Sequence, residues 1–457
     1  MSLEIVILAA GKGTRMKSSL PKVLHTIAGI PMIEHALNAV LKLNPDKIHM
    51  VCGYGIEKIK NFLETFPVDV HVVEQKEQLG TAHAVLQCIP FIKDDSNVLV
   101  LFGDTPMVRE ATLHRVLSQL VNSDLAVLTA IVSDPSKLGR IIRDQNGSFV
   151  KIVEEKDATP EQLEINEINT GICCGNAKLF KEYLPLIGNN NKQQEYYLTD
   201  LFSIALSKGK KVATAETGSE FESLGVNDRL QQAKLERLYQ MHQAEELMQQ
   251  GVFIVDPARF DLRGTVKCGQ DVVIDTNVII EGDVTIGNNV VIGTGCLLKN
   301  CSIGDGSVIS PYSVIESSIL HNETTIGPFA RLRPGCELAD KVHVGNFVEV
   351  KNSKINKGTK AGHLTYIGDS EVGSDVNFGA GTITCNYDGA NKHKTVIGDD
   401  VFIGSDTQLI APVTIGNGAT LGAGSTISKN VKDGELVITR VPQRHIPGWA
   451  RPVKNKK

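Results

Sequence analysis

Aliphatic residues return at every sixth position through the second half of the chain. The ladder begins with Ile274, Ile280, Ile286, Ile292 and Leu298. After one-residue slips it continues through Ile303, Ile309, Ile315, Leu320, Ile326, Leu332, Leu338, Val344 and Val350, and a later register carries Ile397, Ile403, Leu409, Ile415, Leu421 and Ile427. This period fits neither an amphipathic helix nor an alternating strand. It predicts short strands joined by corners and stacked coil upon coil, because one hexad cannot bury its aliphatic residue alone.

Residues 273–431 should therefore form a parallel β-helix of hexapeptide repeats. With three hexads per coil, the stretch is long enough for roughly eight or nine coils. An ordinary β-sandwich with regular turns is the alternative. The long run of in-phase aliphatic positions argues against that alternative.

The first 229 residues follow a different pattern, in which apolar runs alternate with helical periodicity. Strands are expected at residues 5–10, 47–51, 68–73 and 97–102, and helices at 32–43, 57–65 and 81–88. Near-continuous aliphatic strands separated by helices predict an α/β domain with a mainly parallel sheet.

A long polar stretch separates these two patterns. Residues 228–250 contain neither Pro nor Gly, so they should form one helix that ends at Gly251 and acts as a rigid spacer. We therefore expect an α/β domain at residues 1–229, a helical linker at 230–250, and a β-helix domain with a C-terminal tail at 251–457.

Composition narrows the class of protein. The 457 residues carry a formal net charge of -5, which argues against nonspecific binding to nucleic acid. The apolar N-terminal run lacks a basic leader and is too short for a signal peptide, and no stretch reaches the length of a membrane span. The nine cysteines are scattered and none has CxxC spacing. We expect free thiols, a cytoplasmic protein, and no nucleic-acid or membrane partner.

The first predicted strand leads into a loop with chemistry suited to phosphates. Gly11 and Gly13 let backbone N–H groups approach phosphate oxygens, and Lys12, Arg15 and Lys22 supply positive charge. The loop is not a Walker motif, and it lacks the third Gly of the dinucleotide fingerprint. A Gly-rich loop is on its own a weak signal for a nucleotide.

Two further segments strengthen that signal. Gln75 and Gln78, followed by Gly80 and Thr81, lie where a strand passes into a helix, and their amides could contact the edge of a base. Asp104 ends the buried strand at 97–102, where α/β sheets bind ligands, and a carboxylate beside phosphates is a natural Mg²⁺ ligand. A turn-forming or capping role for Asp104 remains the alternative.

Polar residues also interrupt the hexad pattern of the second half. Arg333, Lys351, His363 and Tyr366 stand beside ladder positions, and residues 384–394 skip the period, which predicts a loop outside the β-helix. His363 is the candidate general base, because its ordinary pKa lies near physiological pH and an amine nucleophile must lose a proton in acyl transfer. A solvated surface residue is the alternative for the histidine and for each cation.

The motifs together resemble those of the sugar-1-phosphate nucleotidyltransferases. The matching segments are residues 8–16 with Lys22, Gln78-Leu79-Gly80-Thr81-Ala82, Gly103-Asp104, Ile168-Asn169-Thr170-Gly171 and Gly225-Val226-Asn227. Joined to a helical arm and hexapeptide repeats, they resemble one bacterial family over essentially the whole chain. That family combines N-acetylglucosamine-1-phosphate uridyltransferase with glucosamine-1-phosphate N-acetyltransferase activity. The resemblance implies an α/β nucleotidyltransferase (Rossmann-like) domain, a helical arm and a left-handed parallel β-helix.

The resemblance also implies roles for individual residues of the N-terminal half. UTP and UDP-N-acetylglucosamine would contact Leu8, Ala9, Ala10, Gly11, Arg15, Lys22, Gln75, Gln78, Gly80, Thr81, Phe102, Gly103, Asp104, Gly139, Glu154, Asn169 and Asn227. Asp104 and Asn227 would ligate Mg²⁺. Two positions depart from the family pattern, because Phe102 and Leu138 stand where Tyr is usual.

For the C-terminal half, the resemblance implies acetyl transfer from acetyl-CoA. His363 would be the base, and glucosamine-1-phosphate would contact Arg333, Lys351, Tyr366, Asn377 and Asn386. Acetyl-CoA would contact Ala380, Tyr387, Ser405, Ala423 and Arg440. In this family the β-helices form a homotrimer with each acetyl site between subunits.

The leading hypothesis is therefore a bifunctional enzyme that makes UDP-N-acetylglucosamine from glucosamine-1-phosphate, acetyl-CoA and UTP. The first alternative is a monofunctional sugar-1-phosphate nucleotidyltransferase whose β-helix is structural or regulatory. The second is a noncatalytic scaffold, against which Asp104 and Asn227 argue.

Overall fold

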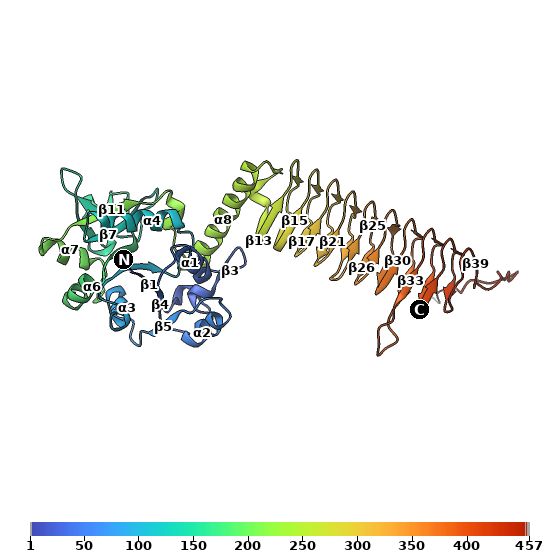
Figure 1. The fold of residues 1–457 in the computed structure, drawn as a ribbon, viewed down its shortest axis with the longest axis horizontal. Coiled ribbons are helices and arrows are strands. Elements are labelled where there is room, and N and C mark those ends of the chain that lie inside the picture. Colours follow the sequence, from blue (N-terminus) through green and yellow to red (C-terminus); the bar gives the residue numbers. More distant parts are fainter. Residues whose placement is uncertain (1, 453, 455–457) are drawn as a thin grey trace. The chain divides into compact units, whose positions relative to one another are not determined.

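The computed structural model describes residues 2–452 and residue 454. The chain divides into two compact units, Met1–Tyr239 and Gln240–Lys457. The boundary falls inside helix α8 (Arg229–Gln249). The first unit contains helices and strands, and the second is built mainly of strands (Figure 1). Each unit has its own buried apolar residues.

A twisted sheet forms the centre of the N-terminal unit, with strand order β11-β7-β10-β6-β1-β4-β5. Strand β1 (Ser2–Ala9) lies between β6 (Ser96–Phe102) and β4 (Lys47–Cys52), and both neighbours are parallel to it. The other members are β5 (His71–Glu74), β7 (Leu125–Ile131), β10 (Glu167–Asn176) and β11 (Val212–Glu216), with the hairpin β8 (Arg140–Arg143) and β9 (Phe149–Val153) beside β10. The strands predicted at 5–10, 47–51, 68–73 and 97–102 are thereby confirmed, within a few residues at each end.

Strand β10 departs from the parallel arrangement. It runs antiparallel to both β6 and β7, with a register shift between Asn169 and Cys173. The sheet is thus mainly parallel, as the aliphatic runs indicated, and β10 is the exception on the main path. Hydrophobicity reports that a strand is buried on both faces, but it does not report the direction in which the strand runs.

Helices pack on both faces of this sheet and complete two apolar cores. Helices α1 (Met32–Leu41), α2 (Ile56–Glu64) and α3 (Thr81–Cys88) match the three expected helices closely. The other main helices of the unit are α4 (Glu110–Ser118), α6 (Ala177–Tyr183) and α7 (Asp200–Ser207). The carboxyl ends of β1, β5 and β6 carry the loops that the sequence marked as functional.

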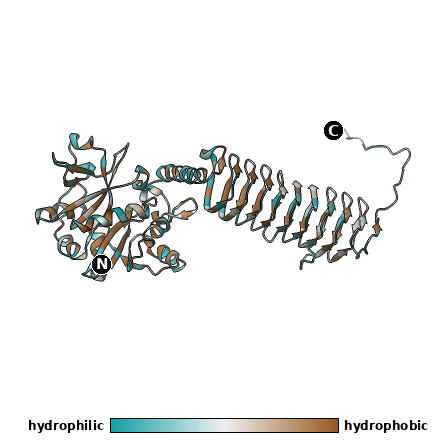
Figure 2. Ribbon diagram, turned by 45° about the horizontal axis from the view of Figure 1, so that its top comes forward, coloured by the Kyte–Doolittle hydropathy of each residue, from teal (hydrophilic) through white to brown (hydrophobic). Residues whose placement is uncertain are grey.

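Helix α8 contributes to both units, although its surface is mostly hydrophilic (Figure 2). In its first half, Leu235 is buried in a small cluster with Met16, Ile27, Met32, Met107 and Val226. In its second half, Ala244 and Leu247 join the core of the β-helix. The expected helix is present, and each of its halves packs in the core of one unit.

The C-terminal unit is a parallel β-helix. One ladder of eleven strands runs along it: β12 (Phe253–Ile254), β14 (Val273–Ile274), β16 (Val291–Ile292), β19 (Val308–Ile309), β22 (Thr325–Ile326), β25 (His343–Asn346), β28 (Lys360–His363), β31 (Asn377–Phe378), β34 (Phe402–Ile403), β37 (Thr420–Leu421) and β39 (Leu436–Val437). Each strand pairs in parallel with the equivalent strand of the next coil, such as Ile274 with Ile292. The coil register is therefore about 18 residues, as three hexads require.

The other faces form a sheet of seventeen strands. They are β13 (Asp261–Cys268), β15 (Ile279–Ile286), β17 (Leu297–Lys299), β18 (Ser302–Ile303), β20 (Val314–Glu316), β21 (Ile319–Leu320), β23 (Arg331–Leu332), β24 (Glu337–Leu338), β26 (Glu349–Lys351), β27 (Lys354–Ile355), β29 (Tyr366–Gly368), β30 (Ser370–Val372), β32 (Ile383–Cys385), β33 (Thr395–Ile397), β35 (Gln408–Ile410), β36 (Val413–Ile415) and β38 (Thr426–Ile427). Every ladder residue identified in the sequence is buried.

The off-period segment also behaves as predicted. Between β32 and β33 the chain leaves the stacked coils as a loop, drawn in orange in Figure 1. All nine cysteines are free thiols, and seven of them are buried. Within the described ranges, no helix is both long enough and apolar enough to span a lipid bilayer.

Candidate active site

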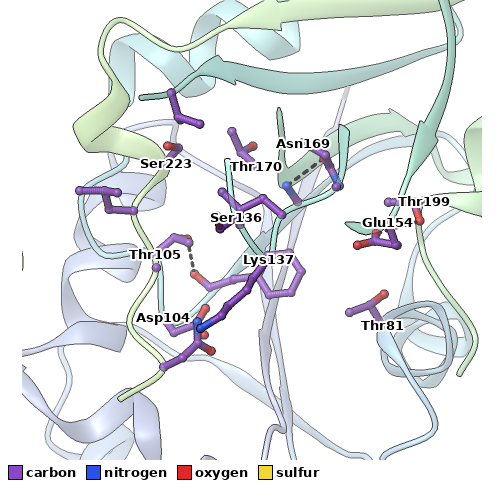
Figure 3. Close-up of a pocket in the computed structure, with 18 of the residues that line it drawn as sticks. Thr81, Asp104, Thr105, Ser136, Lys137, Glu154, Asn169, Thr170, Thr199 and Ser223 are labelled. Carbon is purple, nitrogen blue, oxygen red and sulfur yellow. Dashed lines mark hydrogen bonds between the residues drawn. The ribbon is translucent and has the colours of Figure 1, made fainter. Parts of the chain in front are cut away.

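A cavity of about 530 Å³ opens in the N-terminal unit (Figure 3). Eight of the residues that the sequence marked for nucleotide or sugar line it: Arg15, Thr81, Phe102, Asp104, Gly139, Glu154, Asn169 and Asn227. They come from separate stretches of sequence, and the fold gathers them around one space. The volume lies in the range of small-molecule sites.

Three side chains converge at one end of this cavity. The ammonium of Lys22 contacts the carboxylate of Asp104 and donates to the Oδ1 of Asn227 at 3.1 Å. Asp104 follows β6, and its carbonyl oxygen accepts the N–H of Val226 at 3.0 Å, which brings Asn227 alongside. A carboxylate and an amide oxygen thus point at the same cation.

The same two oxygens fit a magnesium ion. Mg²⁺ prefers oxygen ligands and is commonly held by one or two protein groups, with waters and phosphates completing its shell. Asp104 and Asn227 supply such a pair at the end of the cavity where Lys22 meets them. No group of three or more His, Cys, Asp or Glu side chains that could hold a metal occurs among residues 2–452 and 454.

The Gly-rich loop lies directly beside these residues. The N–H of Gly103 donates to the carbonyl of Leu8 at 3.0 Å, which ties the end of β6 to the end of β1. Ala9 and Ala10 are buried, whereas Gly11 is exposed with open space around it. Gly13 has φ +57, and a Cβ there would lie 2.9 Å from the Cβ of Lys22. The loop therefore packs closely against the segment that carries Lys22.

The predicted base-reading amides are held in position by the protein itself. Gln75 is buried, and its Nε2 donates to the carbonyl of Gly80 at 3.3 Å. The Nε2 of Gln78 donates to the carbonyl of Gln75 at 3.0 Å. Gly80 has φ +119 and packs on the backbone of Tyr196, where a Cβ would meet the carbonyl oxygen at 2.5 Å. Thr81 accepts the N–H of Leu198 at 2.9 Å.

Another wall of the cavity holds the residues expected to bind the sugar. The N–H of Asn169 donates to the carbonyl of Gly139 at 2.8 Å, and the hydroxyl of Thr199 donates to Glu154 at 3.4 Å. Burial raises the pKa of Glu154, and the nearby Asp200 adds to that increase. A partly dehydrated carboxylate with few partners is available to accept hydrogen bonds from hydroxyl groups.

The two departures from the family pattern both lie in this cavity. Phe102 lines it with its aromatic ring packed over Gly171. Leu138 lines it as well and packs against a small cluster formed by Ala130, Val132 and Ile168. Each keeps an apolar surface at the cavity without a hydroxyl.

Several lining residues were not predicted from the sequence. They are Thr105, Ser133, Asp134, Ser136, Lys137, Thr170, Gln193, Glu195, Tyr197, Thr199, Glu220, Ser223, Gln231 and Lys234, together with apolar neighbours. Most stand in loops without a spacing motif. Only the composition of the turn at Asp134-Pro135-Ser136 marks a loop in the sequence.

A second group of polar side chains gathers on the seventeen-stranded sheet of the β-helix. Asp369 accepts Asn386 at 2.5 Å, Asn352 at 2.6 Å and Lys351 at 3.4 Å. The Nδ2 of Asn386 also reaches the hydroxyl of Tyr366 at 3.4 Å. The fold thus brings together three of the five residues expected to bind glucosamine-1-phosphate, around a carboxylate that the sequence did not mark.

The loop that leaves the β-helix adds a cation to this group. Lys392 of the loop lies close to Lys351, and the contact with that ammonium lowers the pKa of Lys392. Arg333 pairs with Glu349 at 3.0 Å in the neighbouring coil. Tyr387 begins the loop, is exposed, and donates its hydroxyl to the carbonyl of Gly389 at 2.6 Å.

A third group follows one corner of the β-helix. His363, Ala380, Ser405 and Ala423 each lie two positions after the ladder residue of β28, β31, β34 and β37, so they stack in successive coils. The guanidinium of Arg440 donates to the carbonyl of Ala423 at 2.5 Å. These residues form a column in which small side chains leave the coil wall open.

The column and the Asp369 group lie on different sheets. His363 and Asn377 belong to the eleven-stranded ladder, whereas Lys351 and Tyr366 belong to the seventeen-stranded sheet. No hydrogen bond joins the side chain of His363 to either Lys351 or Tyr366 within the described chain.

Comparisons with known proteins find separate family matches in the N-terminal and the C-terminal unit. Residues 5–141 match the family model of the MobA-like NTP transferase domain. Residues 262–360 match the GMPPB C-terminal domain, and residues 394–429 match six repeats of the bacterial transferase hexapeptide.

Two solved structures are similar to the chain. One is described as a glucose-1-phosphate thymidylyltransferase from Bacillus anthracis in complex with a sucrose, with 21% identity over 52% of this chain and 95% of that one and a TM-score of 0.43. The other is UDP-glucose pyrophosphorylase complexed with UDP-glucose, with 19% identity over 52% of this chain and 98% of that one and a TM-score of 0.44. The chain thus joins an α/β unit that is similar to the MobA-like NTP transferase domain to a parallel β-helix, part of which matches bacterial transferase hexapeptide repeats.

Proposed function

We propose that the chain is a bifunctional enzyme that makes UDP-N-acetylglucosamine. The β-helix would transfer an acetyl group from acetyl-CoA to the amine of glucosamine-1-phosphate. The N-terminal unit would then join N-acetylglucosamine-1-phosphate to UMP from UTP and release pyrophosphate. The observation that carries the first part of this proposal is the convergence of Asp104 and Asn227 on the ammonium of Lys22.

Uridylyl transfer needs positioning and charge neutralisation rather than a covalent intermediate. A phosphate oxygen of the sugar phosphate attacks the α-phosphorus of UTP, the bond to the leaving pyrophosphate breaks, and negative charge collects between them. Lys22 and Arg15 would stabilise that charge, and Asp104 and Asn227 would hold a magnesium ion that supplies further positive charge. The protein contributes by holding both substrates in line within one cavity.

The sugar would occupy the wall formed by Gly139, Glu154 and Asn169. Its hydroxyls can donate to the carboxylate of Glu154, and the Asn169 amide can orient the N-acetyl group. The base and ribose would lie against Gln75, Gln78 and Gly80, because the Gly permits close approach and the amides are already fixed.

Acetyl transfer is supported by two groups of residues in the β-helix. Lys351, Asn386 and Tyr366 would bind glucosamine-1-phosphate, and the column of Ala380, Ser405 and Ala423 would face acetyl-CoA. His363 stands in that column and would accept the proton of the amine. Since the column and the phosphate-binding group lie on different sheets, we propose that a homotrimer completes the site with residues of a neighbouring subunit.

Two assays of the full chain test the proposal. With UTP, N-acetylglucosamine-1-phosphate and Mg²⁺, the products should be UDP-N-acetylglucosamine and pyrophosphate, and dTTP, CTP or glucose-1-phosphate should be poorer substrates. With acetyl-CoA and glucosamine-1-phosphate, free CoA thiol should appear. Preference for another nucleotide or sugar phosphate would reassign the substrate, and absence of both reactions would overturn the proposal.

A monofunctional nucleotidyltransferase is the second candidate, because no hydrogen bond joins the side chain of His363 to Lys351 or Tyr366 among the described residues. In that case the first assay succeeds, and no acetyl transfer occurs at any protein concentration. Sedimentation equilibrium separates the two. A trimer with acetyltransferase activity supports the bifunctional enzyme, whereas a monomer that acetylates glucosamine-1-phosphate would rule out an obligatory site between subunits.

A further inference from the structure

The turn that precedes Gly139 holds a lysine in a conformation that lysine seldom adopts. Lys137 has φ +67, and the N–H of Leu138 donates to the carbonyl of Pro135 at 3.2 Å. Lys137 is therefore the third residue of a four-residue turn, with a positive φ at that position alone. Such turns favour Gly or Asn there, because a Cβ strains the left-handed conformation.

Further hydrogen bonds fix the turn in place. The N–H of Lys137 donates to the Oε1 of Glu155 at 2.7 Å, and the N–H of Ser136 donates to the Oδ1 of Asp134 at 3.1 Å. The strained backbone is thus held by three hydrogen bonds. Strain of this kind at a cavity points to a function for the side chain.

The side chain of Lys137 extends into the cavity on the side of Asp104 (Figure 3). Its ammonium is exposed and makes neither an ion pair nor a hydrogen bond with any residue in the described part of the chain. Lys22, by contrast, is already engaged by Asp104 and Asn227. The cavity also contains several carboxylates, so an entering phosphate dianion needs additional positive charge.

The position of Lys137 along the cavity wall indicates which phosphate it serves. Gly139 and Glu154 belong to the proposed sugar wall, whereas Arg15 and Asp104 belong to the proposed nucleotide-phosphate end. The acceptor phosphate must lie between these two ends, because it becomes part of the diphosphate that joins sugar and nucleotide. Lys137 lies in the turn immediately before the sugar wall.

We propose that Lys137 binds the phosphate of the sugar-1-phosphate and that its strained backbone is retained to place the ammonium there. This inference rests on the proposed uridylyl transfer and adds a residue that selects the acceptor substrate. It predicts opposite effects on stability and on activity when the lysine is replaced by glycine.

The test compares Lys137→Gly with Lys137→Arg in the full chain. The Gly variant loses a charge-assisted contact, so the KM for N-acetylglucosamine-1-phosphate should rise by about tenfold or more, while the KM for UTP stays within about twofold. Because glycine relieves the left-handed strain, the Tm should hold or rise by about 1–4 °C. The Arg variant keeps the cation and should keep the KM within about threefold of wild type.

Lys341→Gly is the matched control, because Lys341 is also an exposed lysine, with φ +61, but lies in the β-helix. It should leave both KM values unchanged. The inference is overturned if Lys137→Gly leaves the sugar-phosphate KM unchanged, raises both KM values equally, or lowers the Tm by several degrees. Wild-type protein without uridylyl transfer would instead refute the proposed function, so the two failures are distinguishable.

Discussion

The side-chain amide of Asn386 donates to the carboxylate of Asp369 at 2.5 Å, across successive coils of the β-helix. Asp369 also accepts Lys351 and Asn352. One carboxylate therefore sets the positions of two residues that we expect to contact a sugar phosphate. Burial would favour its neutral form, yet these donors and the charge of Lys351 hold the pKa of Asp369 below its usual value.

Replacement of Asp369 by alanine should release Lys351 and Asn386 from their fixed positions. We expect the KM for glucosamine-1-phosphate to rise by about tenfold. Loss of the polar partners that orient binding residues typically lowers affinity or activity by about 10- to 100-fold. Uridylyl transfer should not change. Glu371→Gln is the matched control, since Glu371 lies two residues away on β30 but pairs with Lys394 at the surface. Equal effects of the two substitutions would contradict a positioning role for Asp369.

Asp104→Asn should abolish most of the uridylyl transfer and leave acetyl transfer intact. The carboxylate is the charged member of the pair that faces Lys22, and its loss should lower kcat by roughly 10²–10³ as for other groups that stabilise developing charge. The measurement is pyrophosphate release at limiting and at saturating Mg²⁺. Glu220→Gln removes a carboxylate that lines the same cavity but bonds Ser133, and it should retain most of the activity. Near wild-type rates in Asp104→Asn would remove the residue from the metal site.

His363→Ala should lower the kcat of acetyl transfer by roughly 10²–10⁴, the usual range for losing a positioned base. The KM for acetyl-CoA should change little, since the imidazole would face the amine. His321→Ala, at a surface histidine that pairs with Glu337, serves as the control. If His363→Ala keeps the full acetyl-transfer kcat, the proton of the amine leaves by another route.

Glu154→Gln should make the protein more stable near neutral pH and less active. The folded-state pKa of Glu154 lies above its ordinary value of 4.5 because of burial, so its contribution to stability is fully present below pH 4.5 and is lost as the pH rises through the folded pKa. The Tm difference between variant and wild type should be near zero at pH 4 and increase toward pH 7.

The same substitution removes an acceptor for sugar hydroxyls, so the sugar-phosphate KM should rise by about tenfold. Glu182→Gln, at an exposed position of α6, provides the control for both measurements. A Tm difference that stays flat with pH would show that burial of Glu154 does not limit stability.

Truncation inside helix α8 should reveal how the helix is divided between the two cores. Leu235 is 2% exposed, and Glu236 accepts the N–H of Ala28 at 2.7 Å, so a fragment of residues 1–229 lacks part of its own core. A fragment of residues 1–239 should keep uridylyl transfer and melt several degrees higher than 1–229.

In the full chain, Leu235→Ala should cost about 2–4 kcal/mol of the stability of the N-terminal unit. Leu238→Ala, at an exposed position of the same helix, is the comparison. Identical melting of the two fragments would contradict the shared role of α8.

The hexad ladder was predictable because its signal is local and repeated. Residues such as Ile326 and Leu409 are fully buried, as each hexad required. The direction of β10 was not predictable, because a buried strand has the same composition in either direction. The division of α8 was also hidden, since Leu235 and Leu247 belong to one helical pattern but pack in different cores.

The candidate sites likewise contain some residues that the sequence predicted and some that it did not. Asp104 and Lys22 stand in recognisable motifs, and the fold brings them together with Asn227. Asp369 had no such signal, because it occupies a corner with φ +50, where an acidic residue is common without any function. Lys137 was missed for the related reason that its unusual backbone conformation cannot be inferred from its neighbours.

The uniform pairing of coil on coil has a consequence for how this protein can change in length. Each strand of the ladder meets only its counterparts one coil away, as Ile274 meets Ile292. A duplication or deletion of one complete coil before Arg331 would therefore move everything beyond it as a rigid body, by about 4.8 Å along the axis. The groups around Asp369 and His363 would keep their internal geometry. The addition or loss of whole coils can thus change the length of the β-helix while the arrangement of these residues stays the same.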